Sequence, residues 1–390
     1  MHNFYQQPGG EDVVFAAEAA LLRQNGHDVV EYREDNRRIT GMNRIAVAAR
    51  TVWSHQTQHR LRQVLRDIRC DVAHFHNTFP LISPSAYSAC REARVPVVQT
   101  LHNYRVLCPA ATFFRDQRVC EDCLGKTPPW PSVLHACYRN SHVHTAMAAM
   151  MLTVHRWLKT WQVQVDMYIA LTEFSRRKFI QGGLPREKIV VKPNFVSPDP
   201  GGREGKGEYA LFVGRLSGEK GVHILLRAWN KLRDIPLQII GDGPLLEEAT
   251  LVVRTYGLRA VDLLGRLPRQ EVLALMKRAG LLIFPSELYE GFPVTLAEAF
   301  ACGVPVIVSR LGAMAEIVDD GHTGLLFNPG DSEDLAAKVR WAMDHPNAMG
   351  RMGENARQVY EDKYTPERNY QMLLDIYEQA IRGSRLRMDP

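Results

Sequence analysis

Short apolar runs alternate with longer segments of helical spacing along most of this sequence. A chain in which buried strands alternate with helices folds into βαβ units around a parallel sheet. We therefore predict an α/β protein with doubly wound, Rossmann-like sheets. The expected strands of the first half are Asp71–Phe75, Val95–Leu101, Met167–Thr172 and Lys188–Val191, with helical spacing over Ile45–Ile68. Those of the second half are Tyr209–Gly214, Pro236–Gly241, Val261–Gly265, Gly280–Pro285 and Val304–Ser309.

Length and charge indicate two domains with different partners. The 390 residues suffice for two domains, each with its own core. In residues 197–207 (S-P-D-P-G-G-R-E-G-K-G), apolar residues do not recur at the spacing of a helix or a strand, which predicts a linker. We expect an N-terminal domain over 1–196, a C-terminal domain over 208–365, and a helix over 366–390 that packs back on the N-terminal domain. Residues 1–195 carry 25 basic against 16 acidic side chains, and the remainder carries 23 against 27.

The segment Glu290–Glu298, E-G-F-P-V-T-L-A-E, places two carboxylates eight residues apart around a helix start. Pro293 suits a first helical turn, and the free backbone N–H groups there would bind an anion. These groups belong to Gly291, Phe292 and Val294. Glu290 could then accept hydrogen bonds from hydroxyls, and Glu298 could reach a ribose. The alternative is a helix-capping carboxylate followed by a surface glutamate.

Two further segments of the second half point to an anionic ligand. In Phe212–Gly221 (F-V-G-R-L-S-G-E-K-G), Arg215 and Lys220 lie at the mouth of a strand-to-helix loop, where paired cations suit a diphosphate. Solvated surface cations are the alternative. In G-D-G-P, Gly241 and Gly243 would let a ligand approach the backbone.

Together these segments resemble the family 4 retaining glycosyltransferases of the GT-B fold. The motifs G-R-L-x-x-x-K-G, G-D-G-P, E-x7-E and A-x-G-x-P-V-I all occur between Tyr209 and Pro329. The first half matches more loosely, through P-G-G-E-D (8–12), T-L-H-N (100–103), L-T-E-F-S (171–175) and K-P-N (192–194). The resemblance implies two Rossmann-like domains with an interdomain cleft.

The resemblance also implies roles for individual residues. Arg215 and Lys220 would neutralise the diphosphate of a UDP or GDP sugar, Glu290 would contact the sugar hydroxyls with help from the amides after Gly291, and Glu298 would bind the ribose. His102 would face the transferred sugar, although a histidine beside a strand end is often a satisfied structural residue. The glycine loop near the phosphates would be Gly9 and Gly10, and the base-binding loop would contain Gly265 and Arg266.

The implied reaction breaks an anomeric C–O bond with loss of a nucleoside diphosphate. Charge grows on the departing phosphate, so cations stabilise the transition state. In retaining members of the family, the favoured account is front-face attack with the departing phosphate as base. The sequence contains no Asp-x-Asp, the ligand pair of metal-dependent GT-A enzymes. We expect no cofactor for catalysis.

Four cysteines lie in an irregular stretch from Asn103 to Ser141, which we interpret as an insertion in the N-terminal domain. Their spacing, C-x11-C-x2-C-x13-C, resembles a four-thiolate structural zinc site remote from the chemistry. The residues are Cys108, Cys120, Cys123 and Cys137. Buried apolar thiols and a disulfide are the alternatives.

The N-terminus bears on the first sheet and on localisation. Gly9 and Gly10 follow only eight residues, so we expect either a first strand shortened to His2–Tyr5 or further residues upstream. No signal peptide or membrane span is evident, which favours a cytoplasmic protein. Its basic first half would attract an anionic membrane surface, with a solvated helix face as the alternative, whereas nucleic acid is not an expected partner. The arginines concerned are Arg37, Arg38, Arg44, Arg50, Arg60, Arg62, Arg66 and Arg69.

These observations favour a retaining, metal-independent glycosyltransferase, peripheral on the inner face of the membrane. Its donor would be a nucleotide diphosphate sugar, and its acceptor a surface polysaccharide or a lipid-linked glycan. One alternative is a GT-B nucleotide-sugar 2-epimerase, which would convert the donor without an acceptor. The other is a non-catalytic nucleotide-sugar-binding protein.

Overall fold

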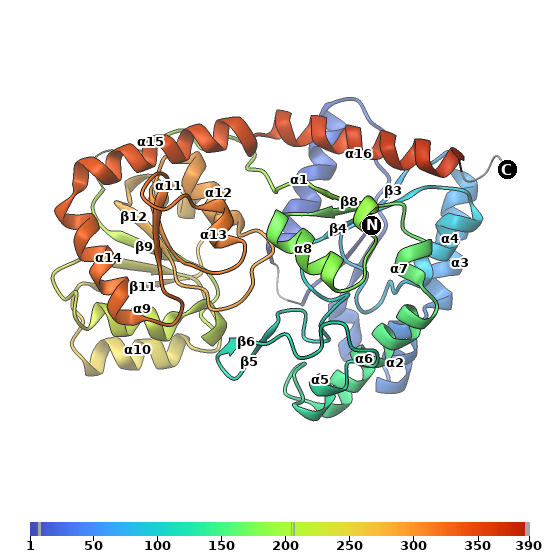
Figure 1. The fold of residues 1–390 in the computed structure, drawn as a ribbon, viewed down its shortest axis with the longest axis horizontal. Coiled ribbons are helices and arrows are strands. Elements are labelled where there is room, and N and C mark those ends of the chain that lie inside the picture. Colours follow the sequence, from blue (N-terminus) through green and yellow to red (C-terminus); the bar gives the residue numbers. More distant parts are fainter. Residues whose placement is uncertain (7–8, 204, 206, 387–390) are drawn as a thin grey trace. The chain divides into compact units, whose positions relative to one another are not determined.

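The chain forms two compact units, each with its own parallel sheet (Figure 1). The structure is a computed structural model that describes residues 1–6, 9–203, 205 and 207–386. Pro8 of the P-G-G-E-D motif and residues 204 and 206 of the expected linker therefore lie outside the described residues. The first unit contains Met1–Phe113, Glu121–Pro193 and the C-terminal residues from Asn369, and the second contains Phe114–Cys120 and Asn194–Arg368.

The first unit contains a four-stranded parallel sheet of order β3-β4-β7-β8. Its strands are β3 (Ala73–Phe75), β4 (Val97–Leu101), β7 (Met167–Ala170) and β8 (Ile189–Val191). Two more short strands, β1 (His2–Phe4) and β2 (Arg33–Asp35), pair in parallel with each other. All four strands expected from the apolar runs of the first half are therefore present, and β1 lies within the expected His2–Tyr5.

β1 continues this sheet beyond β3. The N–H of Asn3 donates to the carbonyl of Asn77, 3.0 Å away, and His2 forms a parallel bridge with Asn77. The strands thus follow one another in the order β2-β1-β3-β4-β7-β8. The direction of winding reverses between β1 and β3, so the loops that follow these two strands leave opposite faces of the sheet at a topological switch point.

Helices cover both faces of the first sheet. α1 (Gly10–Gln24) and α16 (Pro366–Leu386) pack on one face, where Leu22, Leu373 and Ile376 join the core formed by Val98 and Ile169. Apart from α5, which lies in the irregular segment described below, the other helices of this unit are η1 (Asn36–Gly41), α2 (Arg44–Val52), α3 (His55–Asp67), α4 (Ser85–Glu92), α6 (His142–Trp157), α7 (Thr160–Val163), α8 (Glu173–Gln181) and η2 (Arg186–Lys188).

The helical spacing over Ile45–Ile68 corresponds to two helices instead of one. α2 ends at Val52, and α3 begins after Ser54, whose hydroxyl accepts from the N–H of Thr57 at 3.2 Å. The Ser54 N–H in turn donates to the hydroxyls of Ser83 and Ser85. This N-cap breaks a hydrophobic period that otherwise continues through the junction.

The segment from Asn103 to Ser141 contains little regular structure, as its lack of period indicates. Its elements are the hairpin strands β5 (Phe114–Arg115) and β6 (Arg118–Val119) and the short helix α5 (Trp130–Leu134). Aromatic packing anchors its beginning, since Tyr104 stacks on Phe179 with ring centroids 5.4 Å apart and contacts the fully buried Phe113.

The second unit contains a six-stranded parallel sheet of order β11-β10-β9-β12-β13-β14. The first strand in the chain, β9, is central, so winding reverses between β9 and β12. The strands are β9 (Ala210–Val213), β10 (Leu237–Ile240), β11 (Val261–Gly265), β12 (Leu281–Phe284), β13 (Val306–Ser309) and β14 (Gly324–Phe327). The five strands expected here are confirmed, and β14 is an additional one.

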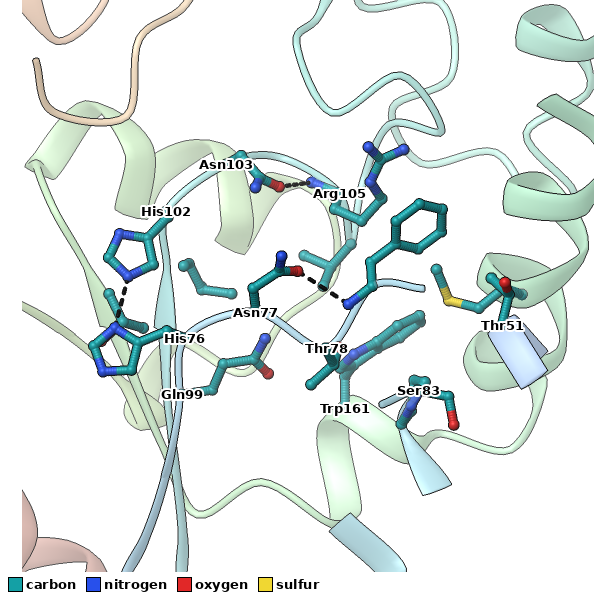
Figure 2. Close-up of a pocket in the computed structure, with 16 residues that line it drawn as sticks. Thr51, His76, Asn77, Thr78, Ser83, Gln99, His102, Asn103, Arg105 and Trp161 are labelled. Atoms are coloured by element: carbon teal, nitrogen blue, oxygen red, sulfur yellow. Dashed lines mark hydrogen bonds between the residues drawn. The ribbon is translucent and has the colours of Figure 1, made fainter. Parts of the chain in front are cut away.

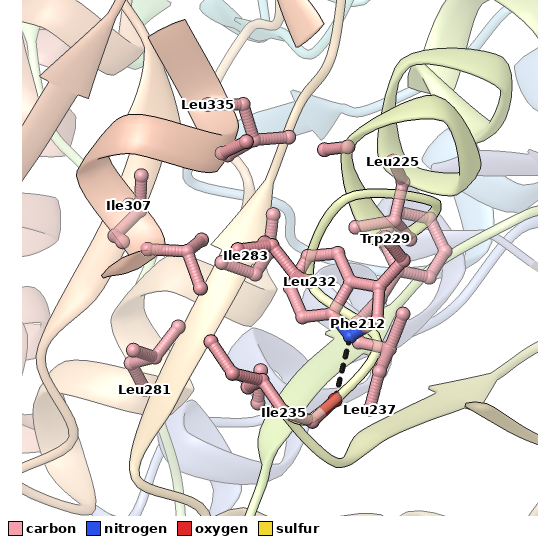
Figure 3. Packing of buried hydrophobic residues seen from close by; sticks show 14 of the residues in the cluster. Phe212, Leu225, Trp229, Leu232, Ile235, Leu237, Leu281, Ile283, Ile307 and Leu335 are labelled. Carbon is pink, nitrogen blue, oxygen red and sulfur yellow. Dashed lines mark hydrogen bonds between the residues drawn. The ribbon is translucent and has the colours of Figure 1, made fainter. Parts of the chain in front are cut away.

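Two helical layers enclose this sheet (Figure 1). α9 (Val222–Trp229), α10 (Leu246–Thr255) and α14 (Ser332–Asp344) lie on one side, and α11 (Arg269–Arg278), α12 (Val294–Ala301) and α15 (Pro346–Lys363) lie on the other. The connecting helices are η3 (Gly218–Lys220) and α13 (Met314–Ile317). Figure 3 shows the core of the first layer, where the fully buried indole of Trp229 donates to the carbonyl of Ile235 at 2.9 Å.

In the described part of the chain, none of the helices combines the length and the apolarity needed to cross a bilayer.

Candidate functional site

The switch point of the second sheet brings together the two sequence segments with the strongest motifs. β9 leads into Gly214–Lys220, and β12 leads into Pro285–Glu290. The two strands pair through Leu281 with Ala210 and Leu282 with Leu211, and beyond them the N–H of Glu287 donates to the carbonyl of Glu219 at 2.9 Å. Parallel α/β sheets bind their ligands at such places.

Lys220 and Glu290 form an ion pair at this switch point. Lys220 Nζ lies 2.6 Å from Glu290 Oε1, and the Ser286 hydroxyl donates to the same oxygen at 2.7 Å. Lys220 also lies over the ring of Phe284, 5.8 Å from its centroid. The structure therefore joins two residues that the sequence placed 70 positions apart, and it fixes the orientation of the Glu290 carboxylate.

Arg215 supplies a second positive charge to the same loop. Its side chain is exposed, and it makes no ion pair or hydrogen bond within the residues that the structure describes. Lys220 is neutralised by Glu290, whereas the charge of Arg215 is uncompensated. A planar guanidinium of this kind is suited to bidentate binding of a phosphate.

The G-D-G-P turn packs directly on this loop. The N–H of Leu216 donates to Asp242 O and that of Leu245 to Leu216 O, both at 2.9 Å. Gly241 has φ +148°, and a Cβ there would lie 1.8 Å from the carbonyl oxygen of Gly214. A Cβ on Gly243 would lie 2.4 Å from the carbonyl oxygen of Leu216. Both glycines are thus required for loop-to-loop contact, whatever else approaches them.

Helix α12 carries the second carboxylate of the E-x7-E motif. Pro293 occupies the N-cap position and Val294 begins the helix, so the proline lies one residue before the first turn expected for it. Gly291 precedes these residues, and Phe292 is buried against Tyr364 with ring centroids 5.3 Å apart. The first-turn amides of α12 are therefore held at the same edge of the sheet as Glu290.

Glu298 is 8% exposed and is paired with Arg269, whose Nε lies 2.8 Å from Oε1. Burial raises the pKa of Glu298, and the Arg269 guanidinium opposes this shift. Arg269 is the first residue of α11. Three residues earlier lies Arg266, whose side chain is exposed, and the residue before it, Gly265, has φ +68°. Sequence reasoning identified Gly265, Arg266 and Glu298 but missed Arg269, because nothing in its local pattern distinguishes it from a surface cation.

The first unit has a pocket at the carboxyl ends of β3 and β4 (Figure 2). His102 follows β4 and lines it beside His76, which follows β3; His76 Nδ1 and His102 Nε2 are 2.9 Å apart. Burial lowers the pKa of His102 to about 3, so this imidazole is neutral. Asn103 and Arg105 continue the wall, and Arg105 stacks over Phe79, 4.2 Å from the ring centroid.

The glycine pair begins α1. Gly9 is the N-cap, its N–H donates to Asp12 Oδ2 at 2.8 Å, and Gly10 is the first helical residue. The next residue, Glu11, was not singled out from the sequence. It accepts from Asn103 Nδ2 at 2.5 Å and from the Tyr5 hydroxyl at 2.9 Å, and burial raises its pKa to about 7. Glu11 thus connects the glycine pair to the residue beside His102.

Arg156 lies close to two of the four cysteines. Its Nη2 donates to the carbonyls of Val106 and Leu107 at 3.2 and 3.1 Å. Burial lowers the pKa of Arg156, and the nearby thiols of Cys108 and Cys123 oppose the shift. Both of these cysteines are buried, whereas Cys120 and Cys137 are partly exposed.

Comparisons with known proteins agree with this architecture. The family model described as Glycosyltransferase Family 4 matches residues 8–200, and the one described as Glycosyl transferases group 1 matches residues 196–359. A solved structure of Anabaena HepE in complex with UDP and glucose superimposes with a TM-score of 0.67 at 18% identity, covering 96% of this chain and 98% of that one.

Curated relatives are similar over part of their length. An uncharacterized glycosyltransferase of Methanocaldococcus jannaschii is 32% identical over 214 residues, 55% of this chain and 60% of the relative. The glycogen synthase of Mycobacterium tuberculosis is 36% identical over 272 residues, 66% of this chain and 64% of the relative. The chain thus spans less than two thirds of these relatives.

Two Rossmann-like units, each with its switch point, define a GT-B protein. Since the two matched regions together extend from residue 8 to residue 359, the chain belongs to the glycosyltransferases of the family 4 type.

The raised pKa of Glu11 makes folding stability depend on pH. The carboxyl pKa is about 7 in the folded chain and 4.5 in an ordinary glutamate. At pH values between these two pKa values, folding therefore takes up a proton. Stability contributed by protonated Glu11 is therefore present below pH 4.5 and lost as the pH rises through 7. Glu11→Gln removes this loss. Between pH 5 and pH 8, the free energy of unfolding of the variant should therefore rise by about 1–3 kcal/mol relative to that of the native chain.

Urea unfolding of both proteins at the two pH values measures this gain. A constant difference in unfolding free energy between native chain and variant would contradict the raised pKa.

Proposed function

We propose that this chain is a retaining glycosyltransferase that moves a sugar from a UDP or GDP sugar to a surface-polysaccharide or glycolipid acceptor, without a catalytic metal ion. The observation that carries the proposal is the ion pair of Lys220 with Glu290 beside the uncompensated Arg215, at the switch point of the second sheet. The complexes of HepE with UDP and glucose support a nucleotide-sugar donor, and the glycogen synthase relative supports a glycan acceptor.

The residues of this switch point suit the loss of a nucleoside diphosphate. When the anomeric C–O bond breaks, both bonding electrons remain on the phosphate oxygen. Arg215 and Lys220 would stabilise this charge, and the amides at the start of α12 would add partial positive charge. Glu290, oriented by Ser286 and Lys220, would accept hydrogen bonds from sugar hydroxyls. The acceptor hydroxyl would attack from the side of the leaving group and pass its proton to the departing phosphate.

The other proposed donor contacts extend this site. Glu298, held by Arg269, would accept from the ribose hydroxyls, and Gly265 with Arg266 would border the base. From the first unit, His102 would contact the transferred sugar, and Gly9 and Gly10 would approach the phosphates. Gly241 and Gly243 would support the Arg215 loop through the backbone contacts described above.

Replacing Glu290 tests this assignment. Glu290→Ala removes the sugar contact and frees Lys220, so transfer should fall by about 10²–10³-fold or more. The matched control is Glu208→Ala, which breaks the exposed pair of Glu208 with Arg278 (2.6 Å) just before β9, at the opposite edge of the same sheet. Initial rates with a UDP- and GDP-sugar panel measure both variants. Undiminished transfer in Glu290→Ala would remove Glu290 from the site.

The same assay separates the two alternative activities. A 2-epimerase would convert the donor sugar in the absence of any acceptor, and a binding protein would retain the donor unchanged. Transfer that requires an acceptor and yields a product of the same anomeric configuration, read by NMR of the anomeric proton, excludes both.

We further propose that the first unit docks on an anionic membrane through an apolar face of α5 and α6. Val143, Met150 and Trp157 recur every seven residues along the outer side of α6 and are 71%, 50% and 72% exposed. Trp130 and Leu134 of α5, which packs on α6, are 56% and 63% exposed. An apolar stripe with interfacial tryptophans is typical of helices that lie on a bilayer.

Basic side chains border this face and favour anionic lipid. Lys159, which follows α6, is exposed, and Lys126 lies over the ring of Trp130, 5.3 Å from its centroid. By contrast, much of the arginine cluster expected to carry this attraction lies near carboxylates. Arg37 and Arg38 pair with Asp35 and Glu34, Arg50 and Arg60 lie within 4 Å of Glu34, and Arg62 pairs with Glu92.

Vesicle sedimentation tests this face. The native chain should sediment with phosphatidylcholine vesicles that contain phosphatidylglycerol and remain in the supernatant without the anionic lipid. Met150→Ser/Trp157→Ser should lower partitioning about tenfold or more, because each buried apolar side chain contributes about 1.5–3 kcal/mol. Leu251→Ser, on the exposed side of α10 in the second unit, should have no effect. Equal recovery of native chain and double variant would contradict the assignment.

The four cysteines are proposed to bind a structural zinc ion. Four thiols are a preferred donor set for zinc, and Cys108 and Cys123, fifteen residues apart, both lie near Arg156. Zinc held by Cys108, Cys120, Cys123 and Cys137 would organise the irregular segment and would supply no catalytic chemistry. Metal analysis should find one zinc per chain, reduced in Cys123→Ser but not in Cys302→Ser. Purified protein without zinc or iron would contradict this.

A further inference from the structure

A buried ion pair lies behind the pocket of the first unit. Lys192 follows β8 and is fully buried, and its Nζ lies 2.5 Å from Glu18 Oε1 on α1 and 3.2 Å from Asn369 Oδ1 on α16. A carboxylate that keeps its charge in such surroundings needs this compensation. The second oxygen of Glu18, Oε2, is buried and makes no hydrogen bond that meets ordinary geometric limits.

His76 connects this carboxylate to His102. His76 Nε2 lies 3.3 Å from Glu18 Oε2, and its other nitrogen, Nδ1, lies 2.9 Å from His102 Nε2. The two imidazoles are stacked with centroids 5.2 Å apart, and both face the pocket (Figure 2). In the described part of the chain, Nδ1 of His102 has no hydrogen-bond partner.

The positions of the protons follow from these contacts. Burial lowers the pKa values of His76 and His102, so each ring carries a single proton. His76 Nε2 lies 3.3 Å from Glu18 Oε2, and a lone pair on this nitrogen would face the lone pairs of the carboxylate at that distance, so Nε2 must be the protonated nitrogen. Nδ1 of His76 is then an acceptor, and His102 must donate to it from Nε2. The remaining nitrogen of His102 therefore carries a lone pair.

We propose that Glu18 and His76 are positioning residues that fix the tautomer of His102, so that His102 presents Nδ1 as a hydrogen-bond acceptor in the pocket. Lys192 holds the carboxylate that sets these proton positions. The last step rests on the proposed function: Nδ1 of His102 accepts a hydrogen bond from a hydroxyl of the transferred sugar. The site then selects a hydroxyl, which donates, over a substituent that only accepts.

Glu18, His74 and His76 also have donor atoms within 4.8 Å of one another, the arrangement of a possible metal site. Two observations favour the arrangement of protons proposed above over a metal ion. Both nitrogens of His74 already have partners at 2.8 Å, the Tyr377 hydroxyl and the Thr100 hydroxyl. The ammonium of Lys192 already supplies a positive charge to Glu18, and a metal ion would add a second one in the same buried place.

Selective ¹⁵N labelling of histidine tests the tautomer without substrate. Long-range proton–nitrogen correlation spectra distinguish protonated from unprotonated ring nitrogens, and His102→Gln and His76→Gln assign the signals. The proposal expects a proton on Nε2 of both rings and none on Nδ1. A proton on Nδ1 of His102, a doubly protonated His76, or a spectrum of metal-bound nitrogen would overturn it.

Glu18→Gln tests the origin of the tautomer. Lys192 can only donate, so the amide oxygen should remain beside it, and the amide NH₂ should face His76. His76 would then be protonated on Nδ1, and His102 in turn on Nδ1. The control is Asp166→Asn, which replaces a buried carboxylate that accepts from the Val97 N–H at 2.6 Å at the opposite end of this sheet. It should leave both tautomers unchanged.

An unchanged His102 in folded Glu18→Gln would overturn the role of Glu18. If this variant does not fold, the native spectrum still decides the tautomer.

Deoxyfluoro analogues of the donor sugar test the ligand step. Fluorine accepts hydrogen bonds but does not donate them. Replacing the sugar hydroxyl that contacts Nδ1 by fluorine should therefore lower the affinity of the native chain for the donor about tenfold, and that of Glu18→Gln by less. Equal losses in both proteins would overturn the acceptor role of Nδ1. Absence of all donor binding would instead refute the proposed function and leave the tautomer result standing.

Discussion

The reversal of winding in each parallel sheet is the constraint on which the rest of the structure depends. In the second unit, the reversal between β9 and β12 places the loops of Arg215 and Glu290 at one edge, where the N–H of Glu287 donates to the carbonyl of Glu219 at 2.9 Å. In the first unit, the reversal between β1 and β3 places the start of α1 and the residues after β3 at the same edge. Residues far apart in sequence meet there because parallel strands all end on the same side.

Three buried or half-buried carboxylates near these edges are each held by one cation. Glu290 pairs with Lys220, Glu298 with Arg269, and Glu18 with Lys192. Pairs of this kind contribute little net stability, because desolvation offsets the attraction, but loss of one partner leaves a costly unpaired charge. Their value lies in orientation: each carboxylate presents a defined oxygen to whatever binds beside it. Arg215, by contrast, makes no ion pair within the residues that the structure describes, and its uncompensated charge suits an anionic ligand.

Much of the fold could be predicted from apolar periodicity. β9, β10, β12 and β13 coincide with the expected runs because these inner parallel strands are largely buried on both faces and read as continuous apolar segments, and the edge strand β11 is apolar enough to be predicted too. β14 was missed because Gly324–Phe327 begins with a glycine, which fits there since a Cβ would lie 2.4 Å from Val306 O. The break between α2 and α3 depends on hydrogen bonds from Ser54 to Ser83 and Ser85, which no local pattern reveals.

The candidate site could be predicted only where its residues form local motifs. Glu290, Glu298, Arg215 and Lys220 belong to such motifs. Glu18, His76 and Lys192 each look like ordinary polar residues beside apolar segments, and only the packing of α1 against β3 and β8 brings them together. Glu11 and Arg269 were missed for the same reason, since their partners Asn103 and Glu298 are distant in the chain.

Binding of a nucleoside diphosphate at the switch point of the second sheet is the central claim. It is measured most directly by thermal shift of the native chain and of Arg215→Ala with UDP, GDP, UMP and GMP. The account predicts that one diphosphate raises the unfolding midpoint of the native chain more than its monophosphate does, and that Arg215→Ala loses this difference. A native chain that none of the four nucleotides stabilises, or an Arg215→Ala variant stabilised as strongly as the native chain, would contradict it.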